Sequence, residues 1–371
     1  MIEYPLISKK SIRTNKTLKS IQKASCKIYR RPKGRFPKAK IGKVVKLRDR
    51  DCFYDLTEYK PDNLKLIPAE REDILNQIES MEICGLSGSG FPTFQKLKAV
   101  MEAKAKDKYL IVNGVECDPG LLHDKWLLKN HCGEIEKGIE LLAKCINFKK
   151  IILATKEEPT SINPFYEVKT VPNRYPLGAE SILINEVLDI ELAYDELPSV
   201  KGILVLNIQT VYTIYEAIYN NRPANSRFVT IANLSNGNAI VVRVKLNSIV
   251  KDIVSKINKV AHNQPIYLGG GIMAGRKAND EDKITAKINF IGYGKEVPPF
   301  ENLKCKKCGA CARKCPMDIK VNKIIKQLEQ GDLSNRKEFH PERCIQCGTC
   351  TYYCHAGKNT MELVTSLKEK L

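Results

Sequence analysis

Eight of the fourteen cysteines form two copies of one spacing near the carboxyl-terminal end of the sequence. Each copy reads C-x2-C-x2-C-x3-C, the ligand pattern of two-cluster bacterial ferredoxins, and so predicts two [4Fe–4S] clusters. In that pattern the fourth cysteine of each copy binds the cluster of the other copy. The predicted ligand sets are Cys305, Cys308, Cys311 and Cys354 for one cluster, and Cys344, Cys347, Cys350 and Cys315 for the other.

Residues next to these cysteines also bear on the assignment. Gly309 and Gly348 lack a Cβ, so the backbone can turn its N–H groups toward the sulfur atoms. Pro316 follows the fourth cysteine of the first copy, as the pattern expects, whereas the second copy has His355 there. Structural zinc and disulfides are the alternatives, but zinc favours pairs of C-x2-C motifs and disulfides imply export. The other cysteines have no ligand spacing and are expected to be ordinary thiols: Cys26, Cys52, Cys84, Cys117, Cys132 and Cys145.

A second candidate site begins at the glycine-rich loop Gly85–Gly90, which precedes a predicted helix. Glycines let backbone N–H groups approach a phosphate, and a helix N-terminus adds partial positive charge. Lys96 lies one turn into that helix, where it can neutralise the same anion. A tight turn between two helices would look similar, so the loop alone leaves both interpretations open.

The apolar segments predict how these residues are positioned. Helices and strands alternate to about residue 200, which predicts an α/β fold with a parallel sheet and helices on both faces. The segment Asn113–Gly120 ends a strand, at the edge where open α/β sheets bind ligands. Predicted strands are 43–47, 109–112 and 151–154, the linker is 61–68, and predicted helices are 68–81, 93–104, 121–131, 133–146 and 178–187.

The pattern changes after residue 201. Two strands around the turn Asn236–Asn238, followed by a helix, predict a small β-grasp-like α+β unit. A connector is expected to start at Gly269, and Pro298 and Pro299 mark the start of the cluster region. The predicted strands of this region are 202–207, 228–232 and 239–244, and the predicted helices are 211–219 and 248–260.

Three stretches resemble the flavin- and NADH-binding domain of the complex I 51-kDa subunit and, more closely, the Rnf complex C subunit. They are G-x-G-F-P-T-x-x-K at 88–96, N-G-x-E-x-D-P at 113–119 and Y-P-x-G-A-E at 175–180. Together with the cysteine pattern, they occur in the order found in that family. The resemblance covers about residues 70–354 and implies FMN and NADH as cofactors besides the two clusters.

The resemblance also implies roles for single residues. Gly88, Gly90, Phe91 and Lys96 would hold the phosphate and ring of FMN.

The flavin and nicotinamide rings would share one pocket. Asn113, Glu116 and Asp118 would line it, with Glu180 across from them. Hydride transfer needs stacked rings and suitable electrostatics but no protein acid. Glu116 and Glu180 would therefore be the catalytic residues only in the sense that they orient the rings and tune the electrostatics of the pocket. The alternative is a purely structural role, in which the two carboxylates pair with helix ends and with Lys96.

The implied domains are a basic arm with a barrel remnant (1–60), a Rossmann-like FMN/NADH-binding domain (61–200), a β-grasp-like domain with a connector (201–297) and a two-cluster ferredoxin-like domain (298–371). Ser87 and Ser89 stand where the family often has further glycines or an arginine; two serines can still approach a phosphate, so this departure bears on NADH and not on FMN. The short barrel favours soluble relatives of the Rnf C subunit. Those relatives include an electron-transfer protein associated with D-proline reductase and the cobalamin reductase of propanediol utilisation.

Charge is concentrated at the start of the chain. Residues 1–50 contain 17 Lys and Arg but only Glu3 and Asp49, so they carry +15 of the net charge of +19. We expect residues 9–50 to contact an acidic reductase, ferredoxin or flavodoxin, or a membrane-associated complex. Few aromatics interleave with these cations, which disfavours nucleic acid, and a solvated basic tail is the plainer alternative.

The sequence contains no apolar run of the roughly 18 residues that a membrane span needs, and its opening lacks a signal peptide. A cytoplasmic protein, soluble or peripheral to a membrane complex, is therefore expected. The predicted function is transfer of electrons from NADH through FMN and two clusters to a partner. The alternative is a non-enzymatic relay that takes electrons from a ferredoxin or flavodoxin and has no NADH site.

Overall fold

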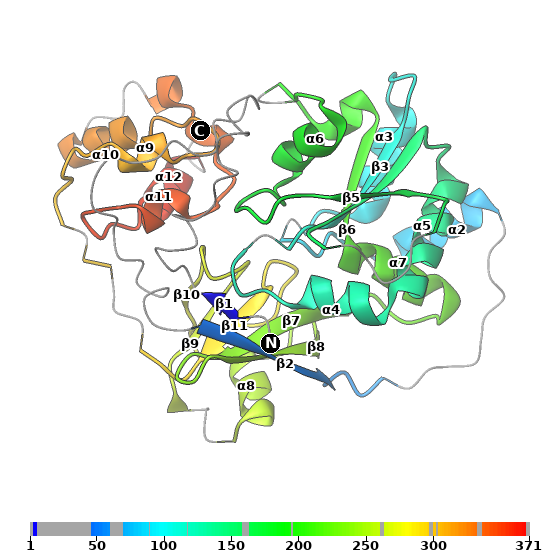
Figure 1. Cartoon of the computed structure of the whole chain (residues 1–371), viewed down its shortest axis with the longest axis horizontal. Coiled ribbons are helices and arrows are strands. Elements are labelled where there is room, and N and C mark those ends of the chain that lie inside the picture. The colour runs from blue at the N-terminus through cyan, green and yellow to red at the C-terminus, as the bar shows by residue number, and fades with distance from the viewer. Residues whose placement is uncertain are drawn as a thin grey trace.

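The computed structural model describes residues 3–5, 46–59, 70–88, 90–116, 118–157, 163–193, 196–259, 263–296, 300–301, 303–331 and 336–368. Most of the basic arm, the linker at 61–68, Ser89, Cys26, Cys117, Pro298 and Pro299 lie outside the described residues. In the described ranges the strands form two sheets, with the cysteine-rich segment packed beside them (Figure 1).

One sheet is entirely parallel, in the order β5-β4-β3-β6. Parallel strands covered on both faces are apolar at successive positions. In β3, Leu110 and Val112 belong to one core and Ile111 to another. The strands are β3 (Tyr109–Gly114), β4 (Lys150–Thr155), β5 (Glu167–Thr170) and β6 (Ile203–Asn207). The predicted α/β fold is confirmed.

Helices cover both faces of this sheet. Ile139 of α5 and Val211 of α7 pack in the core on one face, whereas Leu183 of α6 packs in the core on the other. The predicted helix near residue 74 is also present, with Ile74 and Ile78 fully buried. The helices are α2 (Arg71–Ser80), α3 (Thr93–Glu102), α4 (His123–Asn130), α5 (Cys132–Cys145), α6 (Glu180–Leu188) and α7 (Ile208–Tyr219).

The segment 202–219 corrects the predicted boundary at residue 200. We expected its strand and helix to belong to the β-grasp-like unit, but β6 pairs in parallel with β3, with Tyr109 opposite Ile203. The reason lies in the uninterrupted apolar run 203–206, which is buried on both faces as a strand of a covered parallel sheet requires. These elements therefore extend the α/β region.

The second sheet is mixed, in the order β1-β2-β8-β7-β11-β9-β10. An antiparallel β7–β8 hairpin is followed by α8 (Val250–Ile257), and β11 lies parallel to β7. The assignment of this unit to the β-grasp fold stays a prediction. The strands are β1 (Glu3–Pro5), β2 (Lys46–Asp55), β7 (Ser226–Asn233), β8 (Asn238–Lys245), β9 (Ile266–Gly269), β10 (Arg276–Lys277) and β11 (Phe290–Tyr293).

Two parts of this sheet differ from the sequence predictions. Strand β2 runs to Asp55, well past the predicted end at 47, because its backbone pairs with β8 as far as Arg243. Of residues 47–55 only Leu47 is buried, so burial gives little signal for this extension. Strand β11 lies where we expected a connector, and β9 lies just before it, in a stretch for which no element was predicted. Each has four residues and is bounded by glycine or polar residues, so it carries little periodic signal.

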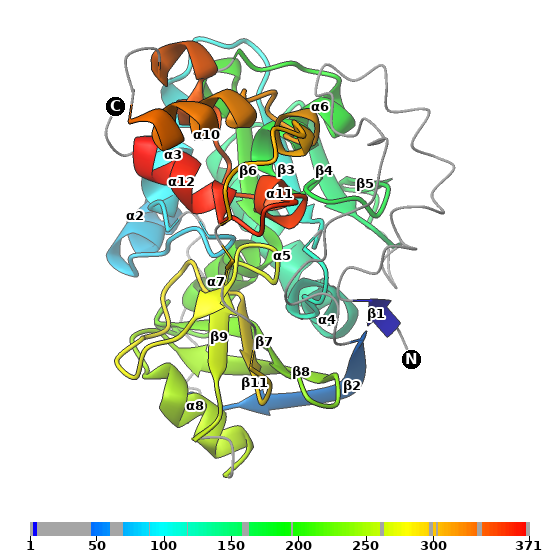
Figure 2. The same cartoon turned by 90° about the vertical axis from the view of Figure 1, so that its left-hand side faces the viewer.

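The cysteine-rich segment is helical and lies against both other parts (Figure 2). Its core contains Ile324 and Ile325 of α10 and Val364 and Leu367 of α12. The elements are α9 (Ala310–Arg313), α10 (Val321–Gln330), α11 (Thr349–Tyr352) and α12 (Thr360–Lys368), with 3-10 turns at Arg336–Phe339 and Pro341–Arg343. Within the described ranges, no helix is both long enough and apolar enough to span a bilayer.

Candidate functional site: two cysteine quartets and a polar cavity

The eight patterned cysteines line two separate cavities, four to each. Cys315, Cys344, Cys347 and Cys350 line one, which we call the inner quartet. Cys305, Cys308, Cys311 and Cys354 line the other, the outer quartet. The fourth cysteine of each sequence copy therefore lies with the first three of the other copy, as the spacing predicted.

The two cysteine loops share one backbone conformation. The second residue after the first cysteine has a left-handed φ in both copies, +51° at Lys307 and +55° at Gln346. The N–H of each of these residues points at the sulfur of Cys305 or Cys344, at 3.4 Å in both cases. N–H groups aimed at sulfur are the donors that stabilise cluster ligands, so the loops fit [4Fe–4S] cubanes.

Electrostatics point the same way. Burial raises the pKa of Cys311 and Cys315 to about 12, and burial also raises the pKa of Cys350. Buried thiols of this kind become thiolates only when a metal ion displaces the proton. Burial raises the pKa of all four thiols of the inner quartet, which suits ligands of iron, and the two quartets would hold one cluster each.

The quartets differ in exposure. In the inner quartet Cys315 and Cys350 are buried, whereas Cys308 of the outer quartet is exposed to solvent. The inner quartet also adjoins a third cavity, because Cys347 lines both.

This third cavity brings together the polar segments of the α/β region at the carboxyl ends of β3 and β6. Asn113, Glu116 and Asp118 lie in its wall, together with the Tyr175–Ala179 segment. Of the other predicted residues, Gly88, Gly90, Phe91, Lys96 and Glu180 are outside this wall, and Phe91 is half exposed. The full lining is Ser87, Asn113, Val115, Glu116, Asp118, Leu121, His123, Asp124, Tyr175, Pro176, Gly178, Ala179, Asn207, Gly270, Ala274, Asn289, Ile345, Gln346 and Cys347.

Asn113 ties two of these segments together. Its side-chain NH2 donates to the carbonyl of Gly178 at 2.9 Å, and its side-chain oxygen accepts from the N–H of Val115 at 3.0 Å. The amide thereby fixes the end of β3 against the Y-P-x-G-A-E stretch. The cavity wall here is backbone and amide, which suits the polar edge of a flavin ring.

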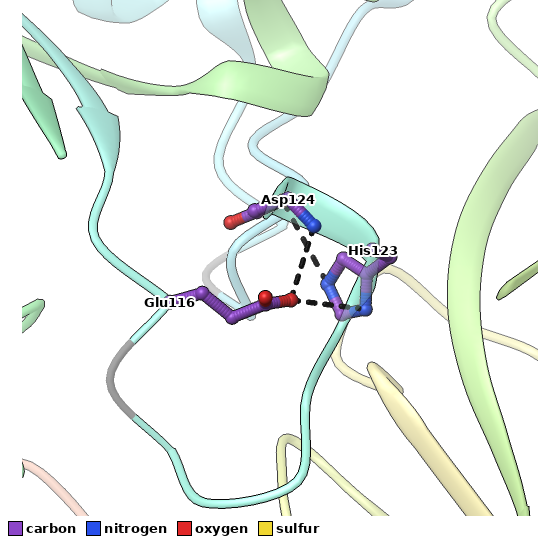
Figure 3. A group of neighbouring side chains, drawn as sticks. All are labelled: Glu116, His123 and Asp124. Carbon is purple, nitrogen blue, oxygen red and sulfur yellow. Dashed lines mark hydrogen bonds and ion pairs between the residues drawn. The ribbon is translucent and has the colours of Figure 1, made fainter. Parts of the chain in front are cut away.

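Glu116, His123 and Asp124 form a buried polar group beside the cavity (Figure 3). A carboxylate oxygen of Glu116 accepts from the N–H of Asp124 at 3.0 Å, at the N-terminus of α4. His123 Nδ1 lies 3.6 Å from the same Glu116 oxygen and 3.0 Å from the hydroxyl of Thr230. Donor atoms of the three residues lie within 4.8 Å of one another, but both Asp124 oxygens are already within reach of the Asn207 and Gln209 amides.

Protonation of this group follows from its burial. Burial, reinforced by the nearby Asp124 carboxylate, raises the pKa of Glu116 to about 8. Burial raises the pKa of Asp124 to about 6, and it lowers the pKa of His123, with a further contribution from the Arg227 guanidinium. Near pH 7 the group therefore holds one proton on the carboxylate pair, on Glu116, and a neutral imidazole, so a single negative charge remains on Asp124.

Glu116→Gln is expected to stabilise the protein at pH 8 and to flatten its pH dependence. The pKa of Glu116 rises from 4.5 to about 8 on folding, so the folded state binds more protons in that window. The free energy of unfolding must then fall as pH rises from about 4.5 to about 8, and glutamine removes this loss. The midpoint temperature at pH 8 should rise by at least about 2 °C, with little change at pH 5.

The fluorescence of Trp126, the single tryptophan, reports unfolding of this region. Glu102→Gln, on the exposed end of α3, is the matched control and should leave the pH profile unchanged. An unaltered profile in Glu116→Gln would mean that Glu116 is ionised when folded.

Lys96 and Glu180 pair with each other. Lys96 Nζ lies 2.6 Å from a Glu180 oxygen and donates to the carbonyl of Val205 at 2.8 Å. The side chains are 26% and 40% exposed, so solvent screens the pair and its contribution to stability is small. Pairing with Lys96 was one of the two roles considered for Glu180 from the sequence. The flavin roles of Lys96 and Glu180 stay predictions.

Asp118 connects the cavity to the loop before β10. Its carboxylate accepts from the N–H of Ile272 at 2.9 Å, and a Cβ on Gly271 would overlap that carboxylate. Burial raises the pKa of Asp118 to about 7, although the hydrogen bonds from the backbone N–H groups of Ile272 and Met273 each act to lower it. Asp118 therefore positions the loop 270–273 as well as lining the cavity.

The same loop meets the inner quartet. A Cβ on Gly348 would overlap the carbonyl oxygen of Met273, so the loop and the cysteine segment touch backbone to backbone. On the other side of the cavity, the hydroxyl of Tyr175 donates to the carbonyl of Cys347 at 2.6 Å. The inner quartet is thus fastened to the cavity by two independent contacts.

Several wall residues were missed from the sequence. Asn207 is the last residue of β6 and could have been found as a polar residue at the carboxyl end of a parallel strand, had β6 been placed in that sheet. Gly270, Asn289 and Gln346 come from other parts of the chain, and no local pattern marks them.

Comparisons with known proteins agree with this architecture. A family model described as the Nuo51 FMN-binding domain matches residues 78–216, and one described as a 4Fe-4S dicluster domain matches residues 304–358. The first match continues through β6 and α7, in agreement with the corrected boundary.

Two curated relatives are each named as the C subunit of an ion-translocating oxidoreductase complex. The protein of Haemophilus influenzae (strain PittEE) is 29% identical over 286 residues, which is 72% of this chain and 43% of the relative. That of Rhodobacter capsulatus is 26% identical over 292 residues, 75% of this chain and 55% of the relative. The chain thus spans about half the length of these relatives.

A solved structure has the same fold. In the crystal structure of an NAD+-reducing [NiFe]-hydrogenase in the air-oxidized state, the similarity covers 79% of this chain and 63% of that chain, with a TM-score of 0.57 and 15% identity. The fold and the site define a chain with an FMN-binding domain and a [4Fe–4S] dicluster domain. Its sequence is similar to the C subunits of ion-translocating oxidoreductase complexes.

Proposed function

We propose that this chain is an electron-transfer subunit that oxidises NADH and delivers single electrons to a protein partner. The observation that carries the proposal is the shared wall: Cys347 lines both the cavity of the α/β region and the inner quartet. A nucleotide site without a redox role would have no reason to share a wall with a cluster ligand.

Bound FMN would supply the conversion of a two-electron donor into one-electron steps. The chain's own residues would provide the setting. Asn113 and the backbone of Gly178 would hold the polar edge of the ring, and Glu116, protonated in its buried group, would donate a hydrogen bond without repelling the electron-rich flavin. Tyr175 would keep the ring close to the inner quartet.

NADH as the donor is supported by the resemblance of residues 88–96, 113–119 and 175–180 to a flavin- and NADH-binding domain, and by the α3 N-terminus, whose first turn contains no acidic residue that would repel a phosphate. The partner is proposed to be an acidic reductase, ferredoxin or flavodoxin, and attachment to a membrane complex is proposed from the names of the relatives. Residues 9–50, proposed to make this contact, lie outside the described residues except for the start of β2.

The proposal predicts that anaerobically purified protein contains FMN and about eight irons, and that NADH bleaches both chromophores. Bleaching should need less than about a minute at millimolar NADH, because hydride transfer between stacked rings requires no slow protein step. A titration of flavin and iron absorbance with NADH provides the measurement. The same titration with NADPH tests which nucleotide is the donor. Reduction with dithionite is the control that shows that the clusters can be reduced.

One observation favours the alternative function, a relay without an NADH site. Ser87 lines the cavity in place of a family glycine, which favours a chain that binds flavin but not NADH. In that case dithionite, but not NADH, would bleach FMN-loaded protein, and the relay from a ferredoxin or flavodoxin would replace the first proposal.

A further inference from the structure

The two cysteine loops have the same backbone but different residues between their first two cysteines. The inner loop has Ile345 and Gln346, and both line the flavin-type cavity. The outer loop has Lys306 and Lys307 at the same two positions, and both are exposed. Backbone geometry cannot explain this difference, since Lys307 and Gln346 have nearly equal φ values.

The cations of the outer loop form one surface. Lys304, Lys306, Lys307 and Arg313 are exposed, and the segment 303–314 contains no acidic residue. Arg313 bends back over the loop and donates to the carbonyl of Cys308 at 2.7 Å, which holds its charge beside the exposed cysteine. Leu303 adds an apolar surface that is 49% exposed.

The cationic surface lies around the quartet that is exposed to solvent. The inner quartet faces the cavity and is enclosed, whereas the outer quartet reaches the surface at Cys308. A surface that combines cations, some apolar area and a cluster ligand matches the way electron carriers meet their partners, in small, charge-complementary and transient contacts.

We infer that the outer loop, Leu303–Arg313, is the docking surface for a small acidic electron-carrier protein. This inference rests on the proposed electron-transfer function but assigns the contact to a surface other than the basic arm. Carboxylates around the carrier's redox centre would pair with Lys304, Lys306 and Lys307, and its apolar rim would cover Leu303.

The test compares two variants of equal net charge. Lys306→Glu/Lys307→Glu reverses the docking surface, and Lys245→Glu/Lys256→Glu reverses two exposed lysines on β8 and α8, which lie away from the helices of the cysteine-rich segment (Figure 1). Each double change lowers the net charge by four, from +19 to +15. Lys306→Ile/Lys307→Gln gives the outer loop the residues of the inner one and removes charge without reversing it.

Binding of an acidic flavodoxin by titration calorimetry is the first readout. We expect the dissociation constant to rise at least about tenfold for Lys306→Glu/Lys307→Glu at low salt and the difference to shrink at high salt, while the β8/α8 control stays near wild type.

The second readout is electron delivery from dithionite-reduced, desalted protein, so neither NADH nor the nucleotide site takes part. Flavodoxin should be reduced more slowly by the reversed protein, and the basic protein cytochrome c more quickly. Equal rates for the two reversed variants, or slower transfer to both acceptors, would overturn the docking surface. If the charge reversal changes the two transfer rates as expected but the wild-type protein does not oxidise NADH, only the proposed function is overturned.

Discussion

Replacing Cys344 and Cys347 by alanine is expected to block NADH-driven reduction of the outer cluster by several orders of magnitude. The inner quartet contains the cysteine that lines the flavin-type cavity, and the outer quartet contributes no residue to that cavity wall. The variant should retain about four irons, and dithionite should still reduce them, since the outer quartet keeps its ligands. Iron analysis and electron paramagnetic resonance after each reductant provide the measurement.

The matched control is Cys305→Ala/Cys308→Ala, which removes two ligands of the outer quartet and should also leave about four irons. In this control NADH should reduce the remaining cluster. Outer-cluster reduction by NADH in the Cys344/Cys347 variant would contradict the order of the two quartets. The single change Cys354→Ala tests the crossing of ligands, and it should resemble the outer-quartet variant although Cys354 lies in the second sequence copy.

Gly348→Ala is expected to slow electron delivery from the flavin to the clusters by at least about tenfold, with little effect on flavin reduction itself. A Cβ at this position would overlap the carbonyl oxygen of Met273, and backbone cannot move aside as a flexible side chain can. The inner cysteine loop must then shift away from the loop 270–273, and a shift of about 1 Å at a reacting centre can be costly. Stopped-flow absorbance after NADH addition separates flavin bleaching from cluster bleaching.

Gly309→Ala offers a close control within the same chain. Gly309 is the equivalent residue of the outer loop, with a φ of +66° against +69° at Gly348. Both changes therefore carry a similar left-handed penalty, of order 1–2 kcal/mol. The Cβ at Gly309 would meet only the end of the Arg313 side chain, 2.8 Å away, which can rotate. Equal effects of the two substitutions would show that strain in the loop, and not its contact with Met273, is responsible.

Local patterns were sufficient for much of the architecture. The helix around Ile74 and Ile78 and strands β3 and β4 could be predicted because each carries its own periodic or continuous apolar signal. Strands β9 and β11 could not, because four residues bounded by glycine or polar residues carry too little pattern, and β11 pairs with β7, which is distant in the chain.

The candidate site divides in the same way. Asn113, Glu116 and Asp118 lie at or just after the end of one strand, so a sequence argument can place them at the sheet edge. The buried group of Glu116, His123 and Asp124 required the structure, because its burial and its contacts involve residues as distant as Arg227 and Thr230. Lys96 and Glu180 were expected at the flavin; the structure shows that they pair with each other, and their flavin roles stay predictions.

The sequence by itself determined the first three cysteines of each quartet, since ligand spacing within a tight loop is a local property of the backbone, and the ferredoxin pattern predicted that the fourth cysteine crosses to the other copy. Only the tertiary structure decided which quartet faces the flavin-type cavity and which faces solvent. That choice depends on contacts such as Tyr175 with Cys347, 172 residues apart, and Gly348 with Met273. Such contacts are set by how whole sheets and helices pack, and no short stretch of sequence encodes them.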